Sequence, residues 1–204
     1  MKKRIMFSMA LLFGVTSIVN AQSIVGGLKV TPSFALVKDN SPEIDGSGAK
    51  VPVTSGIGYG FGYYEILDFK KHLDLQGEIN FSVNNYRQII ESPGGFSQVN
   101  KWSLSYIDVP LLARIKFDNF GIGIGPMHRF AIGGVKKTED INPIETTITD
   151  EKIKGSSETA LVLDFSYKIK KIYLGLRFAS GTKNTLETGN PSRILSFSFG
   201  YTIF

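Results

Sequence analysis

The 204-residue chain contains no cysteine, only two histidines and a single tryptophan. The absence of cysteine excludes disulfides, thiolate catalysis and the acylated cysteine that anchors a lipoprotein at its cleavage site. An exported domain without disulfides must be held together by a core of its own or by a membrane. Because His72 and His128 have no partner at ligand spacing, the sequence also predicts no metal site and no cofactor.

Long hydrophobic runs are scarce too, and the longest lies at the N-terminus. Three basic residues precede a mostly apolar stretch over residues 5–19, and Val19-Asn20-Ala21 fits a cleavage site. We predict a cleaved signal peptide over residues 1–21 and one exported domain over residues 22–204; a buried first helix or an uncleaved anchor is the alternative. No later apolar run approaches the roughly 20 residues of a transmembrane helix, so the mature chain would enter a membrane as strands.

A large excess of one charge is missing as well. The chain has 23 basic and 18 acidic residues. Three of the basic residues lie in the predicted signal peptide, which leaves 20 basic against 18 acidic residues. Nucleic-acid binding needs clustered basic surface, so we expect no nucleic acid among the partners.

The sequence instead carries a period-two alternation of apolar and polar residues. From Leu161 to Ile169 and from Leu195 to Ile203 every second residue is apolar, as in a strand with one apolar face. The 22 glycines, 15 phenylalanines and 8 tyrosines are typical of a barrel with a tight interior and interfacial aromatic residues. The predicted strands cover residues 23–37, 52–66, 71–86, 101–117, 120–133, 157–169, 171–180 and 192–204.

The predicted links between these strands alternate in length. Short links at one end and long links at the other are typical of outer-membrane barrels, whose periplasmic turns are short and extracellular loops long. We therefore predict an all-β fold, an eight-stranded antiparallel up-and-down transmembrane β-barrel with both termini on the periplasmic side. The tight links lie around residues 67–70, 117–120 and 169–171, and the long links cover residues 38–51, 88–100, 134–156 and 181–191.

Alternation alone does not say which face of the barrel is apolar, because a soluble lipocalin-like barrel also alternates, with its apolar face inside. The glycines discriminate between the two, since Gly58, Gly60 and Gly62 share one parity, as do Gly121 and Gly123. A glycine row that faces water weakens a strand and gives no packing benefit. A glycine row that faces a narrow lumen leaves room for long charged side chains from across the barrel. The apolar face is therefore predicted to meet lipid.

The polar parity carries acids and bases in near balance. In a narrow lumen they should form ion pairs, because a buried unpaired charge is costly; a solvated outer face of a soluble barrel is the alternative. Aromatic residues near strand ends, among them Tyr64, Tyr106 and Tyr173, are expected in two interfacial belts. The expected structural lumen network consists of Lys29, Glu78, Asp108, Arg114, Arg129, Asp164 and Arg177.

Two motifs in the fourth and fifth predicted strands carry a family resemblance. Residues 104–117 read LSYIDVPLLARIKF, and residues 121–126 read GIGIGP. They resemble the YLEIPLLLKYKF and GGP signatures of the outer-membrane β-barrel proteins of Bacteroidetes, the PorT-like family. The resemblance implies the same barrel and an involvement in secretion or envelope organisation. Within the motif, Pro110 removes one ladder donor and so predicts a bulge or local bend.

The terminal aromatic residue is out of step with the strand that it ends. The outer-membrane assembly machinery reads a C-terminal aromatic residue that normally continues the lipid-facing parity. Here that parity ends at Ile203, whereas Phe204 has the opposite parity. Either the last residues form a β-bulge, or the assembly machinery tolerates a shift of one residue in the C-terminal signal.

No set of catalytic residues emerges from the sequence. Small outer-membrane lipid deacylases pair a histidine with a serine two residues later, whereas Phe130 follows His128 and Asp74 follows His72. There is no Gly-x-Ser-x-Gly elbow, and no predicted helix follows the glycine row to make it a phosphate loop. The acidic residues of the 134–156 link do not follow the spacing of a calcium-binding loop, so we interpret this link as a solvated loop rather than a calcium site. Its acids are Glu139, Asp140, Asp150 and Glu151.

These features predict a small integral outer-membrane protein of a Gram-negative bacterium without enzymatic activity. The lumen is expected to be too narrow and too filled for general diffusion. The long extracellular loops, or the barrel as an anchor, would then do its work. Expected partners are outer-membrane lipid and lipopolysaccharide, the barrel assembly machinery and an unidentified envelope protein. The alternatives are a barrel enzyme that acts on lipid and a soluble lipocalin-like ligand carrier.

Overall fold

The computed structural model describes residues 23–36, 53–70, 72–92, 96–141, 145–184 and 191–204. The predicted signal peptide and the predicted 38–51 link lie outside these residues. None of the described residues forms a helix that is long and apolar enough to cross a membrane. The described strands are β1 (Ser23–Leu36), β2 (Val53–Ser55), β3 (Ile57–Lys70), β4 (Leu73–Ser92), β5 (Phe96–Phe117), β6 (Phe120–Ile141), β7 (Thr146–Ile153), β8 (Glu158–Ile169), β9 (Ile172–Asn184) and β10 (Pro191–Thr202).

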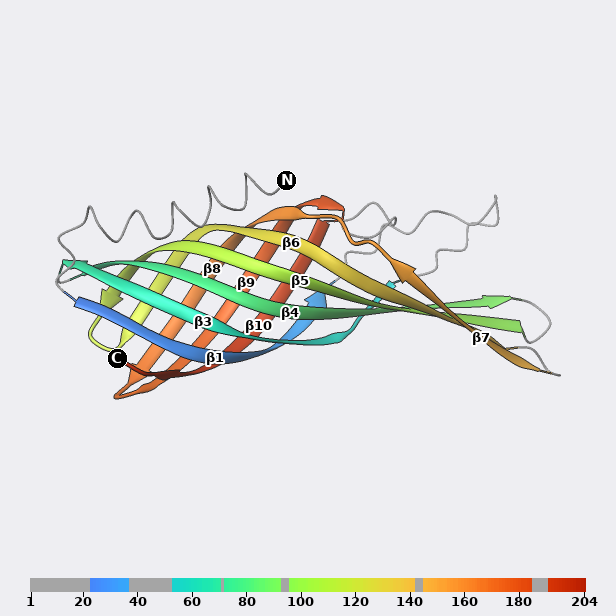
Figure 1. Cartoon of the computed structure of the whole chain (residues 1–204), viewed down its shortest axis with the longest axis horizontal. Helices are drawn as coiled ribbons and strands as arrows, with labels where there is room; N and C mark the ends of the chain where they lie inside the picture. Colours follow the sequence, from blue (N-terminus) through green and yellow to red (C-terminus); the bar gives the residue numbers. More distant parts are fainter. Residues whose placement is uncertain (1–22, 37–52, 71, 93–95, 142–144, 185–190) are drawn as a thin grey trace.

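All pairings between these strands are antiparallel, and the sheet closes on itself. Around the ring the order is β1, β3, β4, β5, β6, β8, β9, β10 and again β1 (Figure 1). The antiparallel up-and-down closure predicted from the sequence is confirmed. The predicted count of eight strands is not, because the described sheet has ten. The additional strands are short: β2 pairs with β4, and β7 pairs with β6.

Tight turns join neighbouring strands at one end of the ring. Asp118-Asn119 connects β5 to β6 and Lys170-Lys171 connects β8 to β9, with φ of 51° at Asp118 and 53° at Lys170. The left-handed φ at one residue lets the chain reverse within two residues. The predicted tight link around residues 67–70 is present but displaced, because β3 continues to Lys70, which pairs with Leu73 at the start of β4. The start of β1 and the end of β10 lie at this same end (Figure 1).

At the opposite end the strands run far beyond the ring. β4 and β5 remain paired from the ring out to Ser92 and Phe96, and β6 and β7 remain paired out to Ile141 and Thr146. These two hairpins project together as one sheet, because β5 also pairs with β6 up to Ile141 (Figure 1). Most of the predicted links 88–100 and 134–156 is therefore strand rather than loop. The hydrophobic pattern did not predict these strands, because a solvated two-stranded ribbon with exposed charged residues needs no apolar stripe.

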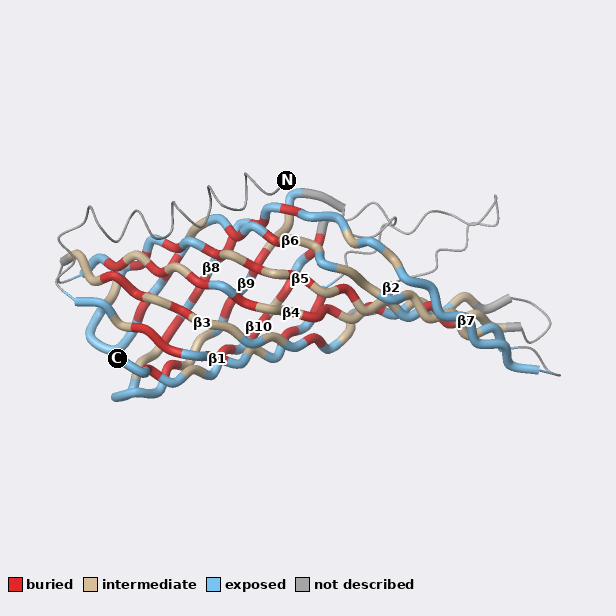
Figure 2. Tube along the Cα trace, in the orientation of Figure 1, coloured by how far each residue is buried: buried red, intermediate tan, exposed pale blue. Residues whose placement is uncertain are grey.

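The two faces of the ring differ sharply in burial. Along β8 the buried and exposed residues alternate from Glu158 to Ser166, and β1 and β6 alternate in the same way (Figure 2). On β1, Lys29 and Ser33 face the interior, whereas Leu28 and Val30 are more than half exposed. The prediction that the apolar face points outward is confirmed. The interior holds buried charged and polar side chains beside small apolar clusters, whereas the exterior is mostly apolar, unlike the exterior of a soluble protein.

A close approach between two strands explains one glycine of the predicted row. A Cβ atom added to Gly125 on β6 would lie 2.0 Å from the backbone oxygen of Leu111 on β5. Gly133 on the same strand has nothing within 4 Å of such an atom. We expect Gly125→Ala to lower the free energy of unfolding by about 1–3 kcal/mol, because the ladder must part. Gly133→Ala should be neutral or slightly stabilising, and equal losses in both variants, measured by denaturant titration, would contradict the close approach.

The C-terminus contains the bulge that was one of the two explanations for Phe204. The backbone nitrogens of Ile203 and Phe204 both donate to the carbonyl oxygen of Gly26, at 2.8 and 3.4 Å. Two residues therefore oppose one, the defining feature of a β-bulge, and both side chains are exposed. The bulge predicted at Pro110 is wrong: Pro110 pairs in register with Met127, and the shift lies at Ser105/Tyr106 instead.

Candidate functional site

The interior of the ring holds a set of buried charged side chains, and this set is the candidate site. The closed sheet places alternate residues of every strand inside. All seven residues expected in the lumen network are buried there: Lys29, Glu78, Asp108, Arg114, Arg129, Asp164 and Arg177. Six of them form two ion-paired clusters, whereas Arg114 lies apart.

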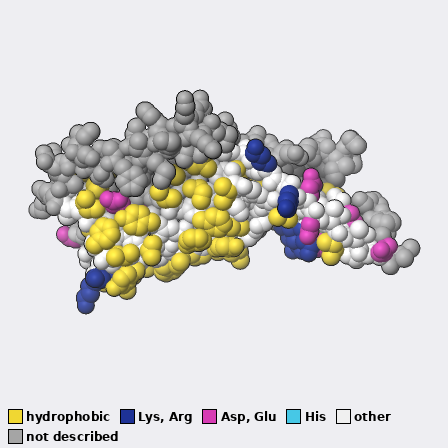
Figure 3. All heavy atoms as spheres, viewed as in Figure 1, with side chains coloured by type: hydrophobic (Ala, Val, Ile, Leu, Met, Phe, Trp, Pro, Cys, Tyr) yellow, Lys and Arg dark blue, Asp and Glu magenta, His cyan; other side chains and the backbone are white. Residues whose placement is uncertain are grey.

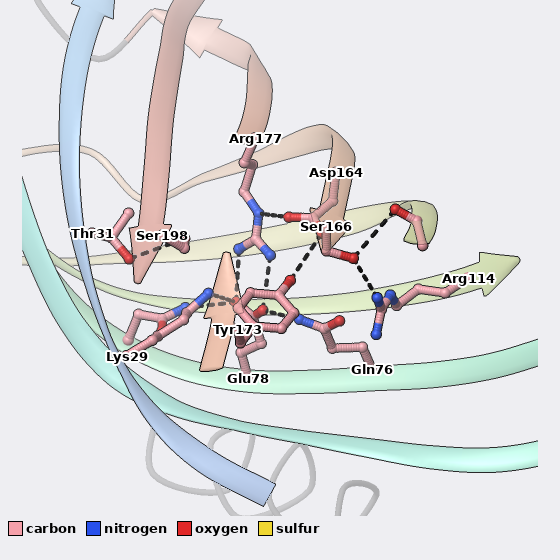
Figure 4. A network of polar contacts seen from close by, with 12 residues as sticks. Lys29, Thr31, Gln76, Glu78, Arg114, Asp164, Ser166, Tyr173, Arg177 and Ser198 are labelled. Carbon is pink, nitrogen blue, oxygen red and sulfur yellow. Dashed lines mark hydrogen bonds and ion pairs between the residues drawn. The ribbon is translucent and has the colours of Figure 1, made fainter. Parts of the chain in front are cut away.

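The first cluster centres on Glu78 of β4 (Figure 4). Arg177 of β9 donates Nη1 to Glu78 Oε2 at 2.7 Å and Nη2 to Oε1 at 2.8 Å, a two-pronged contact across the ring. Lys29 Nζ donates to the same Oε2 at 2.7 Å. Arg177 Nε also bonds Asp164 Oδ1 at 2.8 Å, and Tyr173 donates its hydroxyl to Oδ2 at 3.2 Å. The cluster ties β1, β4, β8 and β9 together through the lumen.

The second cluster centres on Arg129 of β6, which is fully buried. Arg129 Nε donates to Asp108 at 3.0 Å on one side, and Nη1 donates to Glu158 at 2.8 Å on the other. Its guanidinium also stacks on the Tyr106 ring, 4.2 Å from the ring centroid. Asp108, Arg129 and Glu158 are direct neighbours across β5, β6 and β8. The cluster is therefore a cross-strand row rather than a bridge across the lumen.

Arg114 of β5 makes no ion pair among the described residues. It donates Nη2 to the hydroxyl of Ser166, which in turn donates to the carbonyl oxygen of Gly121 (Figure 4). Gly121 and Gly123 lie beneath it, and a Cβ at Gly121 would come within 2.3 Å of Arg114 Nη2. The predicted glycine row therefore does make room for a long charged side chain. That side chain comes from the neighbouring strand, however, and not from across the ring as expected.

Sequence reasoning missed two kinds of interior residue. Glu158 shares the parity of Asp164 and lies inside the predicted strand over residues 157–169, yet it was not included in the expected network. Tyr64, Tyr106 and Tyr173 were expected in the interfacial belts, yet each is at most 1% exposed. Their parity is that of the lumen, and Tyr64 and Tyr173 place their hydroxyls on Thr202 and Asp164. Parity would have placed all four residues correctly.

The gap between the two clusters is small. A cavity of about 50 Å³ lies between them, with Asp108, Arg177 and Ser196 in its lining. Such a volume holds a few water molecules. Between the two clusters the described interior is thus nearly filled by its own side chains.

The histidines and the hairpin acids carry no catalytic or metal constellation in the described residues. His128 is exposed on the outer face, where its ring bonds Thr159 at 3.0 Å, and His72 bonds the Lys116 carbonyl at 3.3 Å. Glu139 bonds Lys101 at 2.8 Å and lies 3.5 Å from Lys137. Hydrogen bonding from Lys101 lowers the pKa of Glu139 below its usual value. The acids predicted in a solvated loop instead lie on the β6–β7 hairpin.

Apolar side chains gather on the face of the ring that Figure 3 shows, and exposed large hydrophobic residues occur on every strand of the ring. On β6 this apolar surface runs from Phe120 to Ile132, thirteen residues. At about 3.3 Å per residue and a tilt of about 40°, these residues span roughly 30 Å, enough for the apolar band of a barrel in a bilayer. Charged side chains in this view gather at the two ends of the molecule (Figure 3). The apolar surface is defined here as the apolar belt.

No protein-family model matches the chain, and no curated protein matches it either. Solved structures do show similarity. Ail of Yersinia pestis, in complex with a heparin analogue, is 10% identical, with a TM-score of 0.41 over 89% of this chain and 100% of that chain. Neisserial surface protein A is 10% identical, with a TM-score of 0.43 over 88% and 95%. The outer membrane protease OmpT of Escherichia coli is 9% identical, with a TM-score of 0.40 over 90% and 95%. At these scores the similarities establish neither a shared function nor a shared site.

Proposed function

We propose that this chain is a non-enzymatic integral protein of the outer membrane of a Gram-negative bacterium, with its tight turns and both ends of the ring on the periplasmic side. One observation carries this proposal: the ring is inside out, with ion pairs in its interior and an apolar belt around it. Such a surface is stable in lipid and prone to aggregation in water. The Glu78–Arg177 pair holds opposite walls of the ring together.

The two projecting hairpins are the parts that would act outside the membrane. They combine a polar, solvated surface with a defined backbone, which suits the recognition of another envelope protein. The resemblance to the PorT-like family adds an involvement in secretion or envelope organisation to this proposal. The barrel would then serve as the anchor of the hairpin sheet.

Lipopolysaccharide is the proposed lipid partner on this side. Arg87, Lys101 and Lys137 lie directly opposite one another on β4, β5 and β6, just beyond the apolar belt. Glu139 already pairs with Lys101 and lies 3.5 Å from Lys137. The phosphate groups of lipopolysaccharide would add further anions to this row of basic side chains. The barrel assembly machinery remains a proposed partner through the C-terminal bulge.

A shortened hairpin tests the interaction role. Thr138 and Thr149 are paired, so residues 138–149 can be replaced by an Asn-Gly turn that joins Lys137 to Asp150. The ring stays intact, and we expect the variant to reach the outer membrane at the wild-type level. Cross-linking and pull-down from detergent-solubilised outer membranes should lose a partner that the full-length protein captures. Capture of the same proteins by both forms would contradict the hairpin role.

The two alternatives conflict with particular observations. A lipocalin-like carrier needs an apolar interior, whereas the described interior is lined by ion pairs. A lipid-modifying enzyme needs a nucleophile or base at the lipid-facing surface, and His128 there contacts Thr159 and Phe130 but no carboxylate among the described residues. We therefore propose the anchoring role rather than either alternative.

A further inference from the structure

Arg114 is a buried cation without a carboxylate partner among the described residues. Its side chain belongs to a residue only 5% exposed, and its Nε has no hydrogen-bond partner. Within the part of the chain that the structure describes, the side chain that it bonds is the neutral Ser166. Burying a guanidinium without a counter-charge costs several kcal/mol. A protein that keeps such a group needs a compensating interaction from elsewhere.

The acid best placed to compensate is already engaged. Asp74 lies directly opposite Arg114 in the β4–β5 register, yet its Oδ1 is 3.1 Å from Lys116 Nζ. Lys116 also pairs with Asp68. One lysine therefore holds both carboxylates on this side of the lumen. Arg114 is turned the other way, toward β8 (Figure 4).

Arg114 borders a pocket of about 240 Å³ at the tight-turn end of the ring. Asp118 and Asn119 of the exposed β5–β6 turn border the same pocket, so it opens toward solvent. Lys168 of β8 also lines it and makes no ion pair among the described residues. Of the three lining carboxylates, Asp68 and Asp74 are held by Lys116, and Asp118 is exposed on the turn. Among the described residues, two cations thus line the pocket without a carboxylate partner.

We propose that this pocket binds a small oxyanion, a carboxylate or a phosphate, through Arg114 and Lys168. The guanidinium is pre-oriented, because Ser166 holds Nη2 while the bare backbone of Gly121 and Gly123 leaves it room. The guanidinium of Arg114 and the ammonium of Lys168 together supply the N–H donors that an oxyanion accepts. Lys168 adds a second positive charge from β8, which is separated from β5 by β6 alone. The site lies in the interior of the ring and stands whether or not the hairpins bind a partner.

The test uses the purified full-length protein in detergent, in phosphate-free buffer. Inorganic phosphate and, in a separate arm, acetate are titrated while the Arg114 Nε–H resonance of ¹⁵N-arginine-labelled protein is followed. We expect a saturable shift of that resonance, and the arm that saturates identifies phosphate or carboxylate as the preferred anion. Isothermal titration calorimetry of the same solutions gives the dissociation constant. The absence of saturation in both arms, meaning that only water fills the pocket, overturns the proposal.

Three variants complete the test. Arg114→Gln should abolish saturable binding, and Lys168→Gln should weaken it about fivefold through the loss of one charge. Lys171→Gln removes an exposed cation of the β8–β9 turn, outside the pocket lining, and should bind as the wild type does. If Arg114→Gln does not fold, Lys168→Gln still decides. Equal affinity in Lys168→Gln and wild type, or equal weakening in Lys171→Gln, overturns the assignment of the site.

Discussion

Replacing Glu78 by glutamine is expected to lower the free energy of unfolding by about 3–5 kcal/mol. Glu78 is the shared acceptor of Lys29 and Arg177, and all three residues are buried. The amide preserves the shape of the side chain but leaves two buried cations facing each other with only Asp164 to balance them. Denaturant titration in detergent or lipid vesicles measures the loss.

A second glutamate in the same chain provides the control. Glu139 also bridges two cations, Lys101 and Lys137, but it does so on the exposed hairpin sheet. Solvent already screens these charges, so Glu139→Gln should leave the free energy of unfolding close to that of the wild type. If the two variants lost equal stability, burial would not be what makes the Glu78 cluster important.

The overall fold could be predicted from the sequence because its signals are local. Gly121 and Gly123 alternate with Ile122 and Ile124 along one strand. This alternation distinguishes the inner from the outer face without any knowledge of which strands pair. Parity then places Lys29, Glu78 and Asp164 in the lumen. Both inferences need only the two-residue period of a strand.

The pairing inside the lumen could be predicted only in part. Counting outward from the Asp118-Asn119 turn places Asp108 opposite Arg129, and the Lys170-Lys171 turn places Asp164 opposite Arg177. The contact between Glu78 and Arg177 is different, because β4 and β9 lie on opposite walls. It depends on how far each strand is staggered around the closed ring, which no single hairpin determines.

The hairpin sheet could not be predicted, for a physical reason. Residues 146–153, Thr-Thr-Ile-Thr-Asp-Glu-Lys-Ile, are almost entirely exposed as β7 and present no apolar stripe. Cross-strand pairs and strand propensity hold such a ribbon together. The same composition is ordinary in a solvated loop, so the hydrophobic pattern does not distinguish the two.

Replacing Ile124 by arginine is expected to lower the free energy of unfolding in lipid vesicles by about 2–4 kcal/mol. Ile124 is 54% exposed and lies near the middle of the stretch from Phe120 to Ile132 on the apolar belt. If lipid surrounds the belt, the arginine must enter hydrocarbon or drag water and headgroups toward it. In water the same exposed position would accept arginine at almost no cost.

Ile148 on β7 is the matched position, because it is 57% exposed but lies on the projecting hairpin. The most direct test of the membrane-embedded, inside-out ring is therefore the difference in folding free energy between Ile124→Arg and Ile148→Arg in the same vesicles. We predict a loss of about 2–4 kcal/mol at Ile124 and a change within about 0.5 kcal/mol at Ile148. Equal and small effects at both positions would contradict the account, because the apolar belt would then face water.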